Sequence, residues 1–375
     1  MAPLTWKVVP TANTLAAVDP ALRADLNPNF PGGAPWAGSN GVQATLNAWG
    51  TLVPSQDDGR VWMANGGGHS DYAGNESYAI DFMAEAPAYS LLHPPSGAIG
   101  YSPGIAYSGG EATGLYPDGR LRAMHGYSQG IHIPGGDIFI AMVSAPFYDP
   151  VATAQKSWWI DADTGVHSLA SDYTALTEVQ GNGEGGSAYD ESRNVVWHLR
   201  NGSGLGVRMM KTDLATGVTT SHGARNTYVG DYCSFVRIPE LDLVLNLNGA
   251  GSGGFFIWNP ATETWKLNPT VTGSYPTGMR SVAASGAKWI PSLGKVVMWN
   301  NSSNGAVFST LTPPASDPIN GTWTRGTLSP DASNTVVPNV FPVAYIFGKC
   351  GYLPAMKGFY LKPTWASPTW FFATE

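Results

Sequence analysis

The stretch "RIPELDLVLNLNGAGSGGFFIWNPATETWKLNP", residues 237–269, carries most of one structural repeat. After Arg237 come an apolar residue and a proline, and two short apolar segments follow, joined through "NGAG". Segments this short and this apolar are typical of strands that are buried on both faces. In the turn "NPATET" that follows, Asn259 and Thr262 can bond nearby backbone N–H groups, and "TWKLNP" supplies another strand. Together with the segment that runs into the proline, the stretch predicts four short strands.

The proline turn recurs along the chain. It stands at Pro54, Pro134, Pro239, Pro291 and Pro354, and "AYDESRN" around Asp190 is a turn of the same kind, so the units repeat roughly every fifty residues. Six units of four short strands predict an all-β fold, a six-bladed β-propeller. Residues 94–120 lengthen the first interval and are rich in Gly, Pro, Ser and Tyr, so we interpret them as an inserted loop. A seven-bladed propeller, with this segment as a degenerate blade, stays open as an alternative.

The two ends of the chain are expected to close the ring. The last unit lacks a fourth strand, and the N-terminal "TWKVVP" resembles the outer strand "TWKLNP" of another unit. Residues 4–9 are therefore expected to complete the last blade, which removes an open strand edge. The whole chain, 1–375, is then one domain with blades at about 35–93, 119–170, 182–222, 228–270, 277–327 and 335–375.

Several motifs resemble kelch repeats, which have a diglycine after the second strand, an aromatic residue in the third and a Trp that opens the fourth. The residues that carry the likeness are "NGGG" at 65–68 with Tyr78, and "NGAG" at 248–251 with Phe256 and Trp265. The resemblance implies a galactose-oxidase-like propeller, a fold that includes oxidases, lyases, glycan-binding proteins and protein-interaction platforms. It therefore implies a fold and leaves the function open.

The composition narrows the choice of partners. The formal net charge is −7 and no block of Lys or Arg stands out, so we expect no nucleic-acid partner. No run of about 18 apolar residues is present in the sequence, so no membrane insertion is expected. The first twenty residues lack the apolar core of a signal peptide, so we expect synthesis in a cytoplasm and, in one setting, incorporation into a virion. Cys233 and Cys350 fall in non-adjacent units and are expected to be buried thiols.

A first set of candidate site residues lies where the chain enters the innermost strands. Ligands of propellers usually meet one face at the central channel, so polar side chains there are candidates. His or Tyr can remove a proton beside a carboxylate that an Arg neutralises, which is the chemistry of polysaccharide lyases. In that enzyme interpretation the catalytic residues are His125, Tyr127, Arg280 and Tyr345. Four other members of the set are expected to bind ligand: Trp49, Glu184, Asp231 and Tyr232. Lys349 also lies in this set, without an assigned role. The alternative is that these side chains only hydrate the channel and satisfy strand ends.

A second set lies in "GGGHSDYAGN", residues 66–75, expected on the same face because it joins a second strand to a third. Its glycines allow a ligand to approach the backbone closely, and His69, Asp71, Tyr72 and Asn75 suit hydrogen bonds and stacking with a sugar. A metal site would need more His or carboxylate ligands at ligand spacing, so no metal is expected. The alternative is an ordinary turn.

No cofactor is expected either. A galactose-oxidase copper site needs paired histidines and a tyrosine joined to a cysteine. Tyr232 and Cys233 are neighbours on an expected strand and point to opposite faces, so they do not supply that pair.

The favoured function is binding of a cell-surface glycan or receptor through one face, in the setting of a phage tail with other virion proteins as further partners. The low share of charged residues and the Tyr-rich segment 96–116 favour it, because aromatic rings stack on sugars. The first alternative is an enzyme, a lyase or hydrolase, that cleaves the same polysaccharide. The second is a structural or protein-interaction platform.

Overall fold

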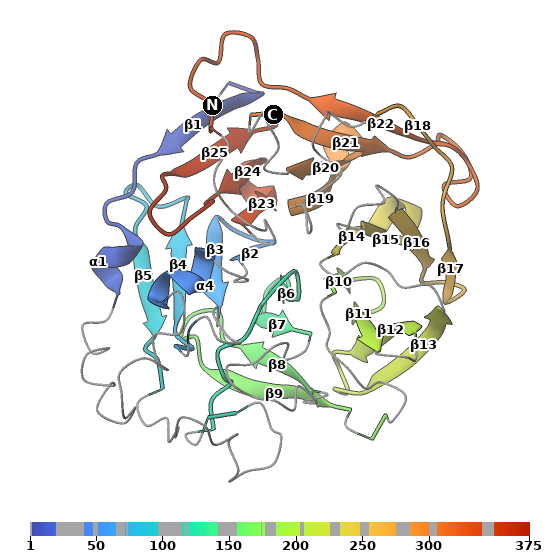
Figure 1. Ribbon diagram of the computed structural model, residues 1–375, viewed down its shortest axis with the longest axis horizontal. Helices are drawn as coiled ribbons and strands as arrows, with labels where there is room; N and C mark the ends of the chain where they lie inside the picture. Colours follow the sequence, from blue (N-terminus) through green and yellow to red (C-terminus); the bar gives the residue numbers. More distant parts are fainter. Residues whose placement is uncertain are drawn as a thin grey trace.

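The computed structural model describes residues 2–19, 41–47, 52–64, 72, 74–96, 115–116, 119–141, 156–173, 175–176, 185–202, 206–225, 233–247, 255–274, 286–299, 306–339 and 349–375. Within these ranges the chain forms six small sheets arranged in a ring around a central axis (Figure 1). The expected all-β, six-bladed propeller is therefore confirmed. The expected inserted loop, 94–120, lies mostly outside the described residues.

Each blade runs from an inner strand at the axis to an outer strand at the rim. The first blade contains β2 (Leu52–Pro54), β3 (Arg60–Ala64), β4 (Ser77–Asp81) and β5 (Tyr89–His93). The second contains β6 (Gly130–His132), β7 (Ile138–Ile140), β8 (Lys156–Ile160) and β9 (His167–Asp172). The third contains β10 (Ser187–Asp190), β11 (Val195–Gly202), β12 (Gly206–Asp213) and β13 (Thr219–Arg225).

The fourth blade contains β14 (Ser234–Ile238), β15 (Leu243–Leu247), β16 (Phe255–Asn259) and β17 (Thr264–Lys266). The fifth contains β19 (Gly286–Ile290), β20 (Lys295–Trp299), β21 (Phe308–Thr312) and β22 (Trp323–Leu328). Its rim gains a fifth strand, β18 (Val271–Thr272), which pairs in parallel with β22. The sequence did not predict β18, which carries the chain from the fourth blade onto the edge of the fifth.

The sixth blade joins the two ends of the chain, as expected. Strands β23 (Cys350–Leu353), β24 (Gly358–Leu361) and β25 (Thr369–Ala373) come from the C-terminal end, and β1 (Thr5–Val9) completes the sheet. The pairing of β1 with β25 is antiparallel, from Thr5 opposite Ala373 to Val9 opposite Thr369. Neighbouring inner strands also contact one another all the way around the ring. Pairing with β1 therefore covers the edge of β25, and the contacts between inner strands complete the ring.

The repeated proline turns adopt one conformation in three blades. They form the short 3₁₀ helices η3 (Pro239–Leu241), η4 (Pro291–Leu293) and η6 (Pro354–Met356). Each is followed by a left-handed residue, Asp242, Gly294 or Lys357, with φ between 50° and 58°. Proline suits the first helical position because it has no N–H to leave unbonded there. The turns from the first to the second strand of each blade define one side of the disc, called here the turn face; they lie at 54–60, 133–137, 190–195, 239–242, 291–294 and 354–357.

The core lies between the blades. Each boundary between neighbouring blades has its own cluster of buried apolar side chains. The largest fully buried side chains include six tryptophans, Trp6, Trp62, Trp197, Trp258, Trp299 and Trp323.

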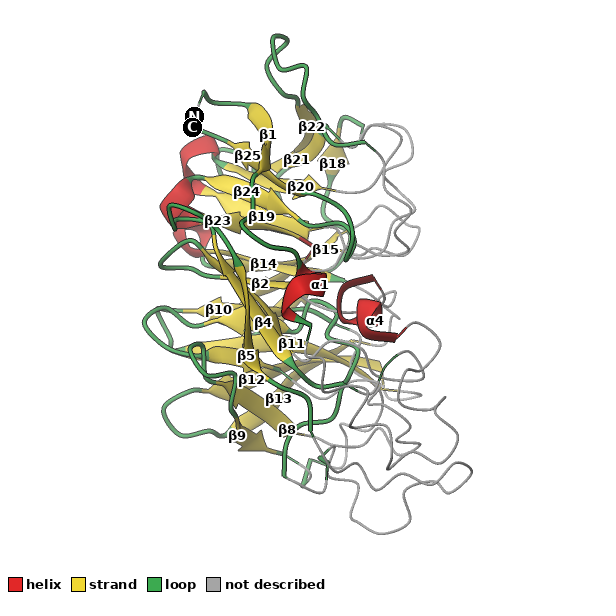
Figure 2. Cartoon of the chain, turned by 90° about the vertical axis from the view of Figure 1, so that its left-hand side faces the viewer, coloured by secondary structure: helices red, strands yellow, loops and turns green. Residues whose placement is uncertain are grey.

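Seen from the side, the strands cross the thickness of the disc, with the short helices α1 (Leu15–Val18) and α4 (Ala44–Asn47) outside the sheets (Figure 2). A further 3₁₀ turn, η2 (Gly41–Gln43), precedes α4. Cys233 and Cys350 are buried thiols, as expected.

Of the helices in the described part of the chain, none is long and apolar enough to span a bilayer.

Candidate functional site

A cavity of about 730 Å³ occupies the central channel and reaches the turn face. Inner strands of all six blades border it. Its volume lies within the roughly 300–1,000 Å³ that is usual for small-molecule sites. Its apolar wall comes from Ile131, Phe235, Trp289, Tyr352 and Tyr360. Its polar and charged wall includes Gln56, His132, Ser187, Asp190, Arg193, Arg237, Asp242 and Lys288.

Three residues, Lys288, Gln56 and His132, are connected by hydrogen bonds along the channel wall. Lys288, on β19 of the fifth blade, donates from Nζ to Gln56 Oε1 at 3.0 Å. Gln56 follows β2 of the first blade, and its backbone N–H donates to His132 Nδ1 of the second blade at 3.1 Å. The fifth and first blades are not neighbours, because the sixth blade separates them. Lys288 therefore reaches across part of the channel.

The turn of the first blade holds Gln56 in place. The Ser55 hydroxyl oxygen accepts hydrogen bonds from the backbone N–H groups of Asp57 (3.1 Å) and Asp58 (3.0 Å). Asp57 Oδ2 accepts the N–H of Gly135 on the turn of the second blade at 2.5 Å. This turn is built by serine and aspartate side chains rather than by a 3₁₀ helix, and it directs Gln56 toward the channel.

Burial lowers the pKa values of Lys288 and His132, the two basic groups of this hydrogen-bonded series. It lowers the pKa of Lys288 to about 8, because desolvation disfavours the ammonium. Burial also lowers the pKa of His132 below its ordinary value, so its ring is neutral at pH 7 and Nδ1 can accept the Gln56 N–H. The His132 ring also stacks on Trp62, with ring centroids 4.9 Å apart, which fixes its plane.

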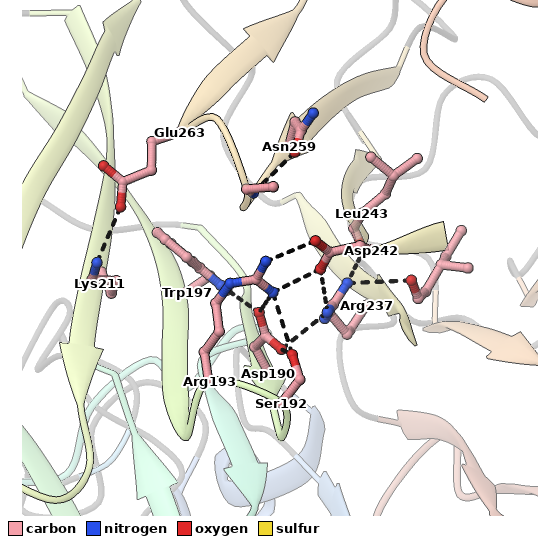
Figure 3. A network of polar contacts seen from close by, with 12 residues as sticks. Asp190, Ser192, Arg193, Trp197, Lys211, Arg237, Asp242, Leu243, Asn259 and Glu263 are labelled. Atoms are coloured by element: carbon pink, nitrogen blue, oxygen red, sulfur yellow. Dashed lines mark hydrogen bonds and ion pairs between the residues drawn. The ribbon is translucent and has the colours of Figure 1, made fainter. Parts of the chain in front are cut away.

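A four-residue ionic network lies on the turn face where the third and fourth blades meet (Figure 3). Asp190 accepts from Arg193 at 2.8 Å and from Arg237 at 3.0 Å. Asp242 accepts from Arg193 at 2.7 Å through both oxygens and from Arg237 at 2.7 Å. Burial alone would raise the pKa of Asp190, but hydrogen bonds from Ser192 and the charge of Arg237 hold it below its ordinary value. Two carboxylates balance two guanidinium groups, so this network is neutral as a unit and ties two blades together.

Of the second predicted set, Tyr72 and Asn75 lie within the described residues, and both are buried. Asn75 donates from Nδ2 to the Ser96 hydroxyl (2.9 Å) and to the Leu121 carbonyl (2.8 Å), and it accepts the Ser96 N–H (2.8 Å). The Tyr72 hydroxyl donates to Glu76 Oε1 at 2.9 Å. These bonds anchor the segment between the first two blades, and the ligand role of the two residues stays a prediction.

Of the first predicted set, the structure brings His125 and Tyr127 together. The Tyr127 hydroxyl and His125 Nδ1 are 2.9 Å apart, and the rings meet edge to face with centroids at 5.5 Å. Both side chains are buried, and Tyr127 has a left-handed backbone with φ of 44°, which is uncommon for a bulky residue. Lys349, at the start of β23, is also buried, and burial lowers its pKa to about 7.

The other predicted site residues lie outside the described residues: Trp49, His69, Asp71, Glu184, Asp231, Tyr232, Arg280 and Tyr345. Their proposed roles, and the expected meeting of Arg280 and Tyr345 with His125, stay predictions.

The channel residues Lys288, Gln56 and Trp289 were missed by the sequence reasoning. It placed ligand contacts at the side where the inner strands begin, whereas the described cavity reaches the opposite, turn face. One signal was present: Lys288 interrupts the apolar inner strand "GAKWI". In the part of the chain that the structure describes, no group of three or more His, Cys, Asp or Glu side chains is placed to hold a metal ion.

Comparisons with known proteins assign no family to the chain. No protein-family model matches the sequence. No curated protein matches it either. Among solved structures, the chain is similar to a structural genomics protein of unknown function from Bacteroides thetaiotaomicron, with 11% identity, a TM-score of 0.36, and 80% of this chain and 82% of the other covered. It is also similar to YjhT, with 9% identity, a TM-score of 0.42, and 85% and 92% covered. Neither likeness bears on function.

Proposed function

We propose that this propeller binds a glycan and that the central channel holds one sugar of that glycan. The observation that supports the proposal is the cavity of about 730 Å³, which combines aromatic walls with hydrogen-bonding side chains at the turn face. Sugars bind through ring stacking on aromatic faces together with directed hydrogen bonds. Trp289 and Tyr352 supply aromatic surface, and Gln56 and Lys288 supply polar groups.

The test is retention of glycans from a panel of cell-surface polysaccharides, with mass spectrometry of the bound and the free fractions. A variant that crowds the channel mouth is Glu191→Trp, since Glu191 is exposed and borders the cavity. A matched control is Glu240→Trp, on the equivalent turn of the fourth blade and outside the cavity wall. We expect intact retained glycan, weakened by Glu191→Trp and unchanged by Glu240→Trp. Equal retention by both variants, or no retention by the wild type, contradicts the proposal.

A second candidate is an enzyme that cleaves the glycan, and the His125–Tyr127 pair favours it. An imidazole hydrogen-bonded to a phenol can transfer protons, as in lyase chemistry. The same mass spectrometry separates the two functions, because lyase products are unsaturated chains with the mass of a lost water. Tyr127→Phe keeps the ring and removes the hydroxyl, so it should abolish such products if the pair is catalytic.

The kelch-like type and the virion setting are separate proposals. The first rests on the sequence rhythm of glycine pairs and aromatic residues, and the second on composition alone. A test of the virion setting is detection of the chain by mass spectrometry in purified particles.

A further inference from the structure

Lys288 differs from the described lysines that pair with a carboxylate, and it shares with Lys266 a bond to a side-chain amide oxygen. Lys156, Lys211 and Lys357 each contact a carboxylate, at 3.3, 3.0 and 2.8 Å. Lys362 donates to the carbonyl oxygens of Trp365 and Ser367. Lys288 contacts the neutral amide oxygen of Gln56, and no carboxylate of the described residues pairs with it.

The charges that share the cavity wall do not compensate Lys288. Asp190 and Asp242 are engaged by Arg193 and Arg237 in the neutral network described above. Glu191 is exposed on the turn of the third blade, and its bulk solvation screens it. Among the described residues of the cavity wall, no buried carboxylate therefore compensates Lys288.

An uncompensated ammonium in a partly buried site is unfavourable, and a bound anion relieves that penalty. Lys288 lines a cavity large enough for a sugar. Gln56 is a weak competitor for Lys288, because its amide oxygen carries only a partial charge, whereas an anionic oxygen carries a formal charge that attracts the ammonium more strongly. The Gln56 backbone stays held by His132, so its side chain can release Lys288 without disturbing the turn.

We propose that the glycan bound in the channel is acidic and that its anionic group binds Lys288 Nζ in place of the Gln56 amide oxygen. This inference rests on the proposed function and adds the chemical class of the ligand. One cation matches one negative charge, so the anionic group is a monoanion, a sugar carboxylate or a sulfate ester. A doubly charged phosphate monoester is matched less well.

The test uses a panel of neutral, carboxylated and sulfated glycans, in which uronic-acid oligosaccharides are paired with their methyl esters. Binding of the full chain is measured by calorimetry for the wild type, Lys288→Met, Lys288→Arg and Lys7→Met, which removes an exposed lysine on β1. We expect only acidic members to bind, and the ester or Lys288→Met to weaken binding about tenfold to a hundredfold, as for the loss of one bond to a charged group. Lys288→Arg should retain most of the affinity and Lys7→Met all of it.

The outcomes separate the two proposals. Binding of carboxylated glycans only would identify the anionic group as a carboxylate, and binding of sulfated glycans only would identify it as a sulfate ester. Binding of neutral glycans at equal strength, or equal binding of an acid and its ester, overturns the acidic class and leaves glycan binding in place. Undiminished binding of an acidic glycan by Lys288→Met overturns the role of this residue. No binding by any member overturns both proposals.

Discussion

Lys288 is the residue on which the proposed binding of an acidic glycan depends. It projects from an otherwise apolar inner strand into the channel, and its partner is an amide 232 residues away in the sequence. Burial lowers its pKa to about 8, so it is still mostly charged at pH 7. A charge kept in such a position is stabilised when a ligand brings the opposite charge.

The affinity for an acidic glycan should depend on pH through this group. Binding needs the ammonium, so affinity should be highest at neutral pH and should fall as the pH rises through about 8 and above. The neighbouring His132 is already neutral there, and Asp190 and Asp242 stay ionised, because the pKa values of all three are lowered. Calorimetric titrations between pH 6.5 and 10 check this. An affinity that stays constant over that range contradicts it.

The free energy of unfolding should rise with pH over the range in which the affinity falls. The folded-state pKa of Lys288 lies below its ordinary value of 10.5, so the folded state binds fewer protons than the unfolded state between about 8 and 10.5. Its unfavourable contribution is therefore full below pH 8 and disappears as the pH rises to 10.5. Lys288→Met should raise the free energy of unfolding at pH 7 by about 1 kcal/mol, a modest value because the side chain is partly exposed. Urea unfolding at pH 7 and pH 10 measures it, with Lys7→Met as control. A lower free energy of unfolding for Lys288→Met at pH 7 would contradict this and would show that Lys288 stabilises the fold.

Asp190 should behave as a structural residue. Asp190→Asn leaves two guanidinium groups facing one carboxylate, so the free energy of unfolding should fall by about 3 kcal/mol at pH 7. The folded-state pKa of Asp190 is lowered, so this contribution is present above its ordinary value of 3.8 and is lost as the pH falls below that value. Denaturant unfolding at pH 7 and pH 3 should show the difference between variant and wild type shrinking in acid. Glu191→Gln, the exposed neighbour, is the control, and an equal loss in both variants contradicts the assignment.

At the scale of the element, the recurring turn residues were the main signal from which the strands could be predicted. The prolines at 239, 291 and 354 form equivalent 3₁₀ turns. Asn259 accepts a backbone N–H bond in its turn, as expected, and Asp161 and Asp213 do the same in outer turns of other blades. Strand β18 could not be predicted in this way. It has two residues, and its parallel partner β22 begins about fifty residues later, so no local periodicity marks the pair.

The closing strand β1 should be essential to the sixth blade. Trp6 is buried, donates from Nε1 to the Ala306 carbonyl at 2.9 Å, and stacks on Phe308 with centroids 5.4 Å apart. Trp6→Ala should lower the free energy of unfolding by about 3–5 kcal/mol, because it removes the largest apolar side chain of the seam and leaves a cavity. Guanidinium unfolding measures it, and Trp6→Phe should recover part of the loss. A change below about 1 kcal/mol would contradict the role of β1 as the closure of the ring.

At the scale of the whole molecule, the number of blades and the closure of the ring followed from the sequence because both are repeated, local signals. The candidate site followed only in part. His125 and Tyr127 are two positions apart, so a local motif revealed them, whereas Lys288, Gln56 and His132 meet only because closure places three blades around one axis. Such a site forms only when the ring closes, so it cannot be predicted from the sequence of any single loop.

The most direct test of glycan binding in the channel is amide hydrogen exchange of the full chain with and without the best-retained glycan. We expect slower exchange in β19 and in residues 55–59 of the first blade, the two segments that carry Lys288 and Gln56, and no such protection in Glu191→Trp. Protection confined to rim strands, or to segments remote from the channel, would contradict it.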